Sequence, residues 1–97
     1  MRAPELESKR TGATIRHWRD RNGAEVDLVL EGDDGTVAGV EVKASSTVST
    51  SDVKNLRLLQ EKLGDRFAAG VVLYLGERIV PLGDRLWAIP VQLLWSD

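Results

Sequence analysis

Three extended segments separated by glycine-containing turns are the feature of this 97-residue chain that most restricts its fold. Alternating apolar and polar residues predict strands at about 13–20, 24–31 and 36–43. The turns between them contain Asn22-Gly23 and Gly32-Asp33-Asp34-Gly35. An Asn-Gly pair is typical of the type I′ hairpin turn, in which both central residues take positive φ. We therefore expect the three strands to pair antiparallel, in sequence order, as a meander.

An amphipathic helix follows the meander and is predicted at about 51–64, with Thr50 or Ser51 as its N-cap. Its apolar stripe consists of residues at helical spacing: Val53, Leu56, Leu59 and Leu63. The continuous apolar run at 67–75 is typical of a strand buried on both faces. Because a helix separates this run from the third strand, we expect a helical crossover that makes the two strands parallel neighbours.

Three short segments complete the expected fold. Residues 78–82 predict an edge strand because they contain Pro81, residues 86–91 another strand, and residues 91–95 a final helical turn. The fold class is therefore α/β, with a mixed sheet built from the meander, a crossover helix and a following buried strand. We expect one domain over 1–97, with its core at 13–95 and a tail, or the remnant of a longer helix, at 1–12.

Three charged residues lie inside two of the predicted strands. A turn centred on residues 33–35 puts Asp27 opposite Glu41, with Cβ atoms about 5 Å apart, and Lys43 shares the face of Glu41. The alternation predicts that Asp27 lies on the strand face opposite Val26, Leu28 and Leu30. Charges placed inside a sheet core are costly unless they are paired or bind a metal.

Two interpretations of this triad remain open. In the first, Asp27, Glu41 and the backbone carbonyl of Val42 hold Mg²⁺, which prefers oxygen ligands, and Lys43 orients or deprotonates an attacking water. In the second, Lys43 forms a cross-strand ion pair with Asp27 or Glu41 on a solvated sheet face.

The spacing Asp27 … Glu41-Val42-Lys43 resembles the D … (D/E)-x-K signature of the PD-(D/E)XK nuclease superfamily. Over residues 14–95 the chain is also similar to the nuclease-like domain of uncharacterised function that follows an AAA+-type ATPase module in bacterial and archaeal proteins. The resemblance implies a restriction-endonuclease-like core with a truncated N-terminal helix. It also implies that Asp27 and Glu41 are metal ligands for Mg²⁺ (with Mn²⁺ as a substitute) and that Lys43 is catalytic.

The same resemblance implies partners and an alternative function. Nucleic acid is the expected substrate, and an AAA+-type ATPase domain in the same full-length protein is the expected neighbour. The superfamily adds a glutamate from an upstream helix, and here only Glu5 and Glu7 are available for that role. The alternative is therefore a non-catalytic interaction module that has kept the nuclease fold, lost the site, and regulates or recruits the ATPase.

Further side chains are weaker candidates for the same chemistry. Glu25 is a candidate for supporting the metal ligands, and Lys54, Arg57 and Ser45 are candidates for contacts with nucleic acid. Each has a plain structural explanation: a solvated strand charge, a solvated helix face, or loop and cap chemistry. Trp18 and Trp87 are expected in the core.

Composition excludes several other classes of protein. The chain has no cysteine, so disulfides and thiolate sites are excluded, and a net charge of −2 does not indicate a strongly basic nucleic-acid binder. Positive charge is nevertheless concentrated early in the chain, at Lys9, Arg10, Arg16, Arg19 and Arg21. No apolar run is long enough for a membrane helix, and Met1 is followed by Arg2-Ala3-Pro4-Glu5, which contains no apolar segment of a secretory signal. We expect a cytoplasmic monomer or weak homodimer without a membrane partner.

Overall fold

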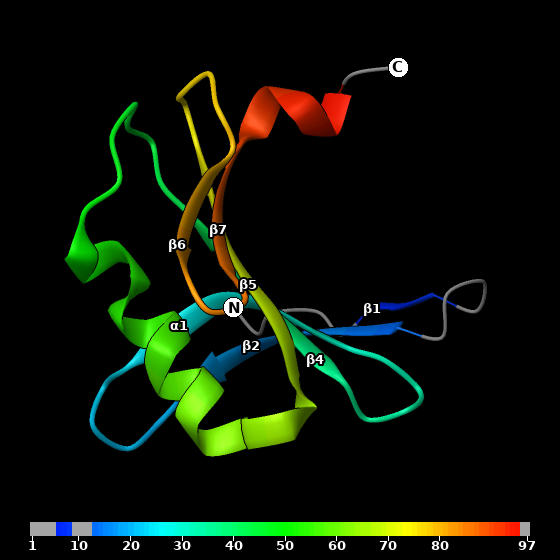
Figure 1. Ribbon diagram of the computed structural model, residues 1–97. Helices are drawn as coiled ribbons and strands as arrows, with labels where there is room; N and C mark the ends of the chain where they lie inside the picture. The colour runs from blue at the N-terminus through cyan, green and yellow to red at the C-terminus, as the bar shows by residue number, and fades with distance from the viewer. Residues whose placement is uncertain (1–5, 9–12, 96–97) are drawn as a thin grey trace.

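The computed structural model describes residues 6–8 and 13–95, which form a mixed β-sheet with one α-helix against it (Figure 1). The elements, in chain order, are β1 (Leu6–Ser8), β2 (Ala13–Arg19), β3 (Glu25–Glu31), β4 (Val37–Val42), α1 (Thr50–Leu63), the 3₁₀ turn η1 (Gly64–Arg66), β5 (Phe67–Tyr74), β6 (Val80–Gly83), β7 (Leu86–Pro90) and the 3₁₀ turn η2 (Val91–Trp95). In the described residues the sheet has seven strands in the order β1-β2-β3-β4-β5-β7-β6. No helix in these residues is long and apolar enough to cross a membrane.

The strand pairing confirms the expected topology. Strands β2, β3 and β4 form an antiparallel meander, and β5 pairs parallel with β4 after the α1 crossover. Strand β6, which contains Pro81, is the edge strand of the sheet, as predicted. The described part of residues 1–12 does not form the expected remnant of a helix. Leu6–Ser8 is a strand that pairs with β2, and the rest of that segment lies outside the described residues.

The first hairpin turn differs from the type I′ prediction. Gly23 has a φ of 86°, but among the described residues the only non-glycine with positive φ is Arg85, so Asn22 does not take the conformation that a type I′ turn requires. Instead, the Asp20 carboxylate accepts hydrogen bonds from the backbone N–H groups of Asn22 and Ala24. This carboxylate stabilises a longer turn in which only the glycine is left-handed.

A β-bulge in β3 changes which residues face the helix. Arg16 pairs with Val29 and Trp18 with Val26, so β3 has one residue more than β2 between these two pairs. The extra residue resets the alternation, and Val26 and Val29 are both buried whereas Leu28 is exposed. The prediction that Val26, Leu28 and Leu30 share one face is therefore wrong, because simple alternation does not continue through a bulge.

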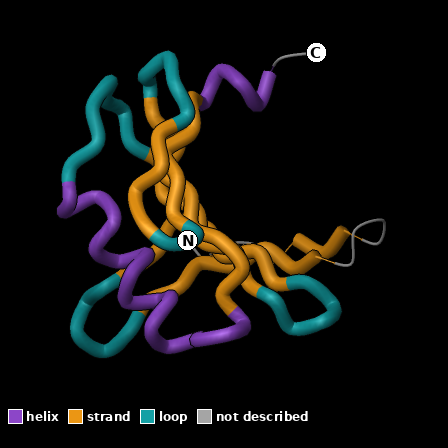
Figure 2. The backbone as a smooth tube through the Cα atoms, in the orientation of Figure 1, coloured by secondary structure: helices purple, strands orange, loops and turns teal. Residues whose placement is uncertain are grey.

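Helix α1 packs against β3, β4 and β5, and this face of the sheet holds the core (Figure 2). The helix approaches closely at Gly39, where an added Cβ atom would lie 2.8 Å from Leu56 Cδ2. The opposite face is apolar but more open: Leu28, Val42 and Trp87 are 40%, 58% and 41% exposed. Trp87 is thus not a core residue, whereas Trp18 is half-buried and packs against the core.

Candidate functional site

The β3–β4 ladder ends where the predicted site residues begin. Leu28 and Val40 form the last backbone pair, and beyond it the side chains of Asp27 and Glu41 cross between the strands. The Asp27 N–H donates to Glu41 Oε1 over 3.0 Å, and the Val42 N–H donates to Asp27 Oδ2 over 2.9 Å. Asp27 and Glu41 are therefore neighbours across the strands, as the predicted register required. Each carboxylate accepts a hydrogen bond from a backbone N–H group that has no partner in the β3–β4 ladder.

The site is at the surface and not inside the core. Asp27 is exposed and Glu41 is half-buried, and no charged side chain among the described residues is buried. The expectation that the charges lie within the sheet core is therefore wrong. They lie at the end of the ladder, where water reaches them and the cost of desolvation is smaller.

The electrostatic environment of Glu41 favours a cation. Burial raises the pKa of Glu41, and the negative charges of Asp27, Glu25 and Asp52 raise this pKa further, against the lowering effect of the Asp27 N–H hydrogen bond. The second oxygen of each carboxylate, Asp27 Oδ1 and Glu41 Oε2, accepts no hydrogen bond from the described residues. A positive ion between these oxygens would remove the repulsion that acts on Glu41.

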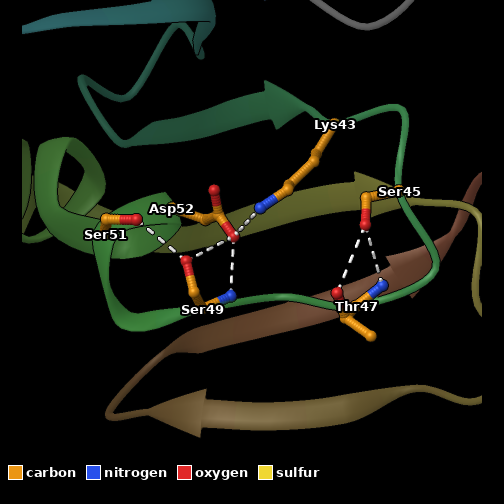
Figure 3. A network of polar contacts seen from close by, with 6 residues as sticks. All are labelled: Lys43, Ser45, Thr47, Ser49, Ser51 and Asp52. Atoms are coloured by element: carbon orange, nitrogen blue, oxygen red, sulfur yellow. Dashed lines mark hydrogen bonds and ion pairs between the residues drawn. The ribbon is translucent and has the colours of Figure 1, made fainter.

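Lys43 binds a residue that the sequence analysis did not select. Its Nζ lies 2.5 Å from Asp52 Oδ2 in the first turn of α1 (Figure 3). Lys43 therefore does not form the expected ion pair with Asp27 or Glu41. Instead, Lys43 joins the end of β4 to the start of the helix.

The same Asp52 oxygen organises the start of α1. It accepts hydrogen bonds from the backbone N–H of Ser49 at 2.6 Å and from Ser49 Oγ at 3.0 Å. Ser49 is thus the N-cap, and the helix begins one residue earlier than predicted. The spacing Ser49-x-x-Asp52 is the sequence signature of a capping box, so this signal was present in the chain. The hydrogen bonds from Lys43 and Ser49 lower the pKa of Asp52.

Two further candidates lie near the triad but already have partners. Glu25 Oε2 lies 3.2 Å from Arg19 Nη2 and 3.3 Å from His17 Nε2 on the neighbouring strand. Ser45 Oγ accepts a hydrogen bond from the Thr47 N–H at 3.2 Å, and its carbonyl accepts one from the Leu75 N–H at 2.9 Å (Figure 3). Glu25 influences the site through its charge, and Ser45 shapes the loop after β4.

The two helix cations lie apart from the triad. Lys54 and Arg57 are exposed residues of α1 that line a shallow pocket with Leu58 and Glu61. Arg57 Nη2 donates to the Leu82 carbonyl over 3.2 Å, which ties the helix to β6. The structure does not bring these residues into the Asp27–Glu41 site.

The donor set fits a hydrated Mg²⁺ ion bound by two carboxylates. Mg²⁺ keeps several waters and uses one or two carboxylates, which Asp27 and Glu41 supply from adjacent strands. The described residues contain no group of three or more acidic, histidine or cysteine side chains that would form a complete protein cage. Among the described residues no upstream glutamate completes the set, because Glu7 pairs with Thr14, which pairs with Glu31 at the far end of β3. Glu5 lies outside the described residues.

Comparison with known proteins gives one match. The family model described as "Domain of unknown function (DUF4143)" matches residues 4–94. Neither the search of curated proteins nor the search of solved structures gives a match.

Proposed function

The chain belongs to the DUF4143 family, a domain of unknown function, and from this premise we propose that it is a metal-dependent phosphodiesterase domain of the PD-(D/E)XK type that acts on nucleic acid. Asp27 and Glu41 would hold Mg²⁺, with the Val42 carbonyl as a further ligand. The bound ion supplies charge stabilisation at the phosphoryl group and an activated water.

The side chains of the chain itself have distinct tasks in this proposal. Asp27 and Glu41 are each oriented by a backbone N–H of the opposite strand, so one oxygen of each is fixed and the other accepts no hydrogen bond from the described residues. Lys43 holds positive charge beside them, where negative charge develops as a phosphodiester is attacked. Asp52 positions the Lys43 ammonium against the first turn of α1.

The observation that supports the proposal is the pair of neighbouring carboxylates, Asp27 and Glu41, each with one oxygen that accepts no hydrogen bond from the described residues. The pKa of Glu41 is raised by its burial and by the Asp27 charge, which is the condition that a bound cation would relieve. An AAA+-type ATPase domain as the neighbour in a longer protein rests on the sequence resemblance alone.

One observation favours the alternative of a non-catalytic module. All three residues of the triad have structural partners: the carboxylates accept backbone N–H groups across the strands, and Lys43 binds the helix cap through Asp52. In that alternative the triad only closes the end of the sheet, and the domain acts on an attached ATPase without cleaving a substrate.

Metal binding is tested by titrating Mn²⁺ into the ¹⁵N-labelled protein. We expect paramagnetic broadening centred on the amides of Asp27, Glu41 and Val42, and its loss in Asp27→Asn. The matched control Asp84→Asn removes a carboxylate elsewhere and should leave the broadening unchanged. Broadening spread over all surface carboxylates would contradict the proposed site.

Cleavage is tested with labelled single-stranded and duplex oligonucleotides in Mg²⁺. We expect cleavage that EDTA abolishes and that Lys43→Ala lowers by at least about 100-fold, the range of losses seen when one charge-stabilising donor is removed. Localised metal binding without any cleavage would favour the non-catalytic alternative.

A further inference from the structure

A second charged site lies at the opposite end of the α1-covered face. Its cleft, of about 340 Å³, lies between the ends of β2, β3 and α1 and the turn η1. Arg16, Lys62 and Arg66 line it, and among the described residues Glu31 is the only acidic one in its lining. In a chain with a net charge of −2, this places three permanent cations around one carboxylate.

Two of the cations share one carboxylate. Arg16 Nη1 lies 4.0 Å from Glu31 Oε1, and Arg66 Nη2 lies 3.9 Å from Glu31 Oε2. Arg66 also donates from Nε to the Gly35 carbonyl over 3.0 Å, which fixes its guanidinium at the rim of the cleft. The contact of Arg66 with Glu31 is long for an ion pair, so Glu31 compensates the charge of Arg66 only in part.

The third cation lies over an aromatic ring. Lys62 Nζ is 5.9 Å from the centre of the Trp18 ring, and Trp18 packs against the core. The floor of the cleft is apolar and includes Val29, Val37 and Leu59. Cations at the rim, an indole and an apolar floor together suit a ligand that carries phosphates beside flat, weakly polar groups.

We propose that this cleft binds the phosphate backbone of a single-stranded nucleic acid, with Arg16, Lys62 and Arg66 contacting phosphates and Trp18 and the apolar floor contacting a sugar or base. The inference rests on the proposed function only where it assumes that one nucleic-acid strand contacts both this cleft and the Asp27–Glu41 site. Binding of the strand to the cleft itself needs neither metal nor cleavage. The 14 residues of α1 separate the two ends by about 21 Å, a distance that a strand of several nucleotides covers.

The test is the fluorescence anisotropy of a labelled fifteen-nucleotide oligo-dT, measured in EDTA across a series of NaCl concentrations. Three phosphate contacts on a single strand predict a slope of log Kobs against log[NaCl] of about −2. Arg66→Gln should weaken binding about 3- to 10-fold at low salt and make the slope shallower by about 0.7. Arg78→Gln, which removes a cation outside the cleft, should match the wild type.

Glu31→Gln keeps the test falsifiable if Arg66→Gln folds poorly. Removing the one acidic side chain of the cleft should tighten oligonucleotide binding severalfold, whereas any loss of structure would weaken it. Equal weakening in Arg66→Gln and Arg78→Gln, no binding at low salt, or binding to phosphatidylserine vesicles but not to oligo-dT would each overturn the proposal. Oligonucleotide binding in EDTA without cleavage in Mg²⁺ would support the proposed binding cleft. It would count only against the proposed nuclease site at Asp27 and Glu41.

Discussion

The two ends of the α1-covered face have opposite charge although strand β3 and helix α1 contribute to both. At the N-terminal end of α1, Asp27 and Glu41 lie beside the Lys43–Asp52 pair, and acidic groups are in excess. At the C-terminal end, Arg16, Lys62 and Arg66 surround Glu31. This difference teaches that one small sheet can present an acidic cluster and a basic cluster at its two ends while none of the charged side chains that the structure describes is buried.

The largest expected effect is on the core that both ends share. Leu56 of α1 is fully buried and meets β4 at Gly39, so Leu56→Ala should lower the free energy of unfolding by about 2–5 kcal/mol. Urea denaturation followed by tryptophan fluorescence and by circular dichroism measures this loss. A change of less than about 0.5 kcal/mol would show that α1 does not hold the two ends together.

An intermediate effect is expected from the helix cap at the acidic end. Asp52→Ala removes the acceptor of Ser49 and Lys43, and should lower the free energy of unfolding by about 1–2 kcal/mol at neutral pH. The pKa of Asp52 is lowered in the folded state, so its contribution is present above the unfolded pKa and is lost as pH falls through the folded pKa.

The difference between Asp52→Ala and the wild type should therefore shrink on acidification, which urea denaturation at a series of pH values measures. Asp65→Ala, in the exposed turn η1, is the matched control and should change stability by less than about 0.5 kcal/mol. Equal losses of unfolding free energy in Asp52→Ala and Asp65→Ala would show that Asp52 does not stabilise the start of α1 in particular.

The smallest effects are expected from replacing a glutamate by glutamine at each end, Glu41 at the acidic end and Glu31 at the basic end. The pKa of Glu41 is raised in the folded state, so the wild type loses stability as pH rises from the unfolded pKa through the folded one. In EDTA, Glu41→Gln should therefore raise the free energy of unfolding at pH 7 by up to about 1 kcal/mol and flatten its dependence on pH.

Glu31→Gln should do the reverse at the basic end. It removes two long ion pairs and should lower stability by less than about 1 kcal/mol, with the loss disappearing in high salt. Thermal unfolding of both variants at low and high NaCl measures the two signs. Changes of the same sign would mean that the ends do not differ electrostatically as described.

Sequence pattern predicted the elements from β2 onward and their order, because local alternation, helical spacing and turn residues are properties of neighbouring positions. It did not predict strand β1. The meander, the α1 crossover, the parallel β4–β5 pair and the edge position of β6 were predicted in this way. The neighbourhood of Asp27 and Glu41 was predicted as well, since the register of a short hairpin follows from its turn.

Tertiary structure alone decided what those residues contact. The bulge in β3 depends on how β2 pairs with it, and it moved Leu28 to the open face, an outcome that alternation within one strand does not contain. Lys43 forms its ion pair with Asp52 and not with a strand carboxylate, because the start of α1 lies next to the end of β4 in the folded chain. The basic cleft likewise combines β2, α1 and η1, whose residues are distant in sequence and meet only when the helix packs on the sheet.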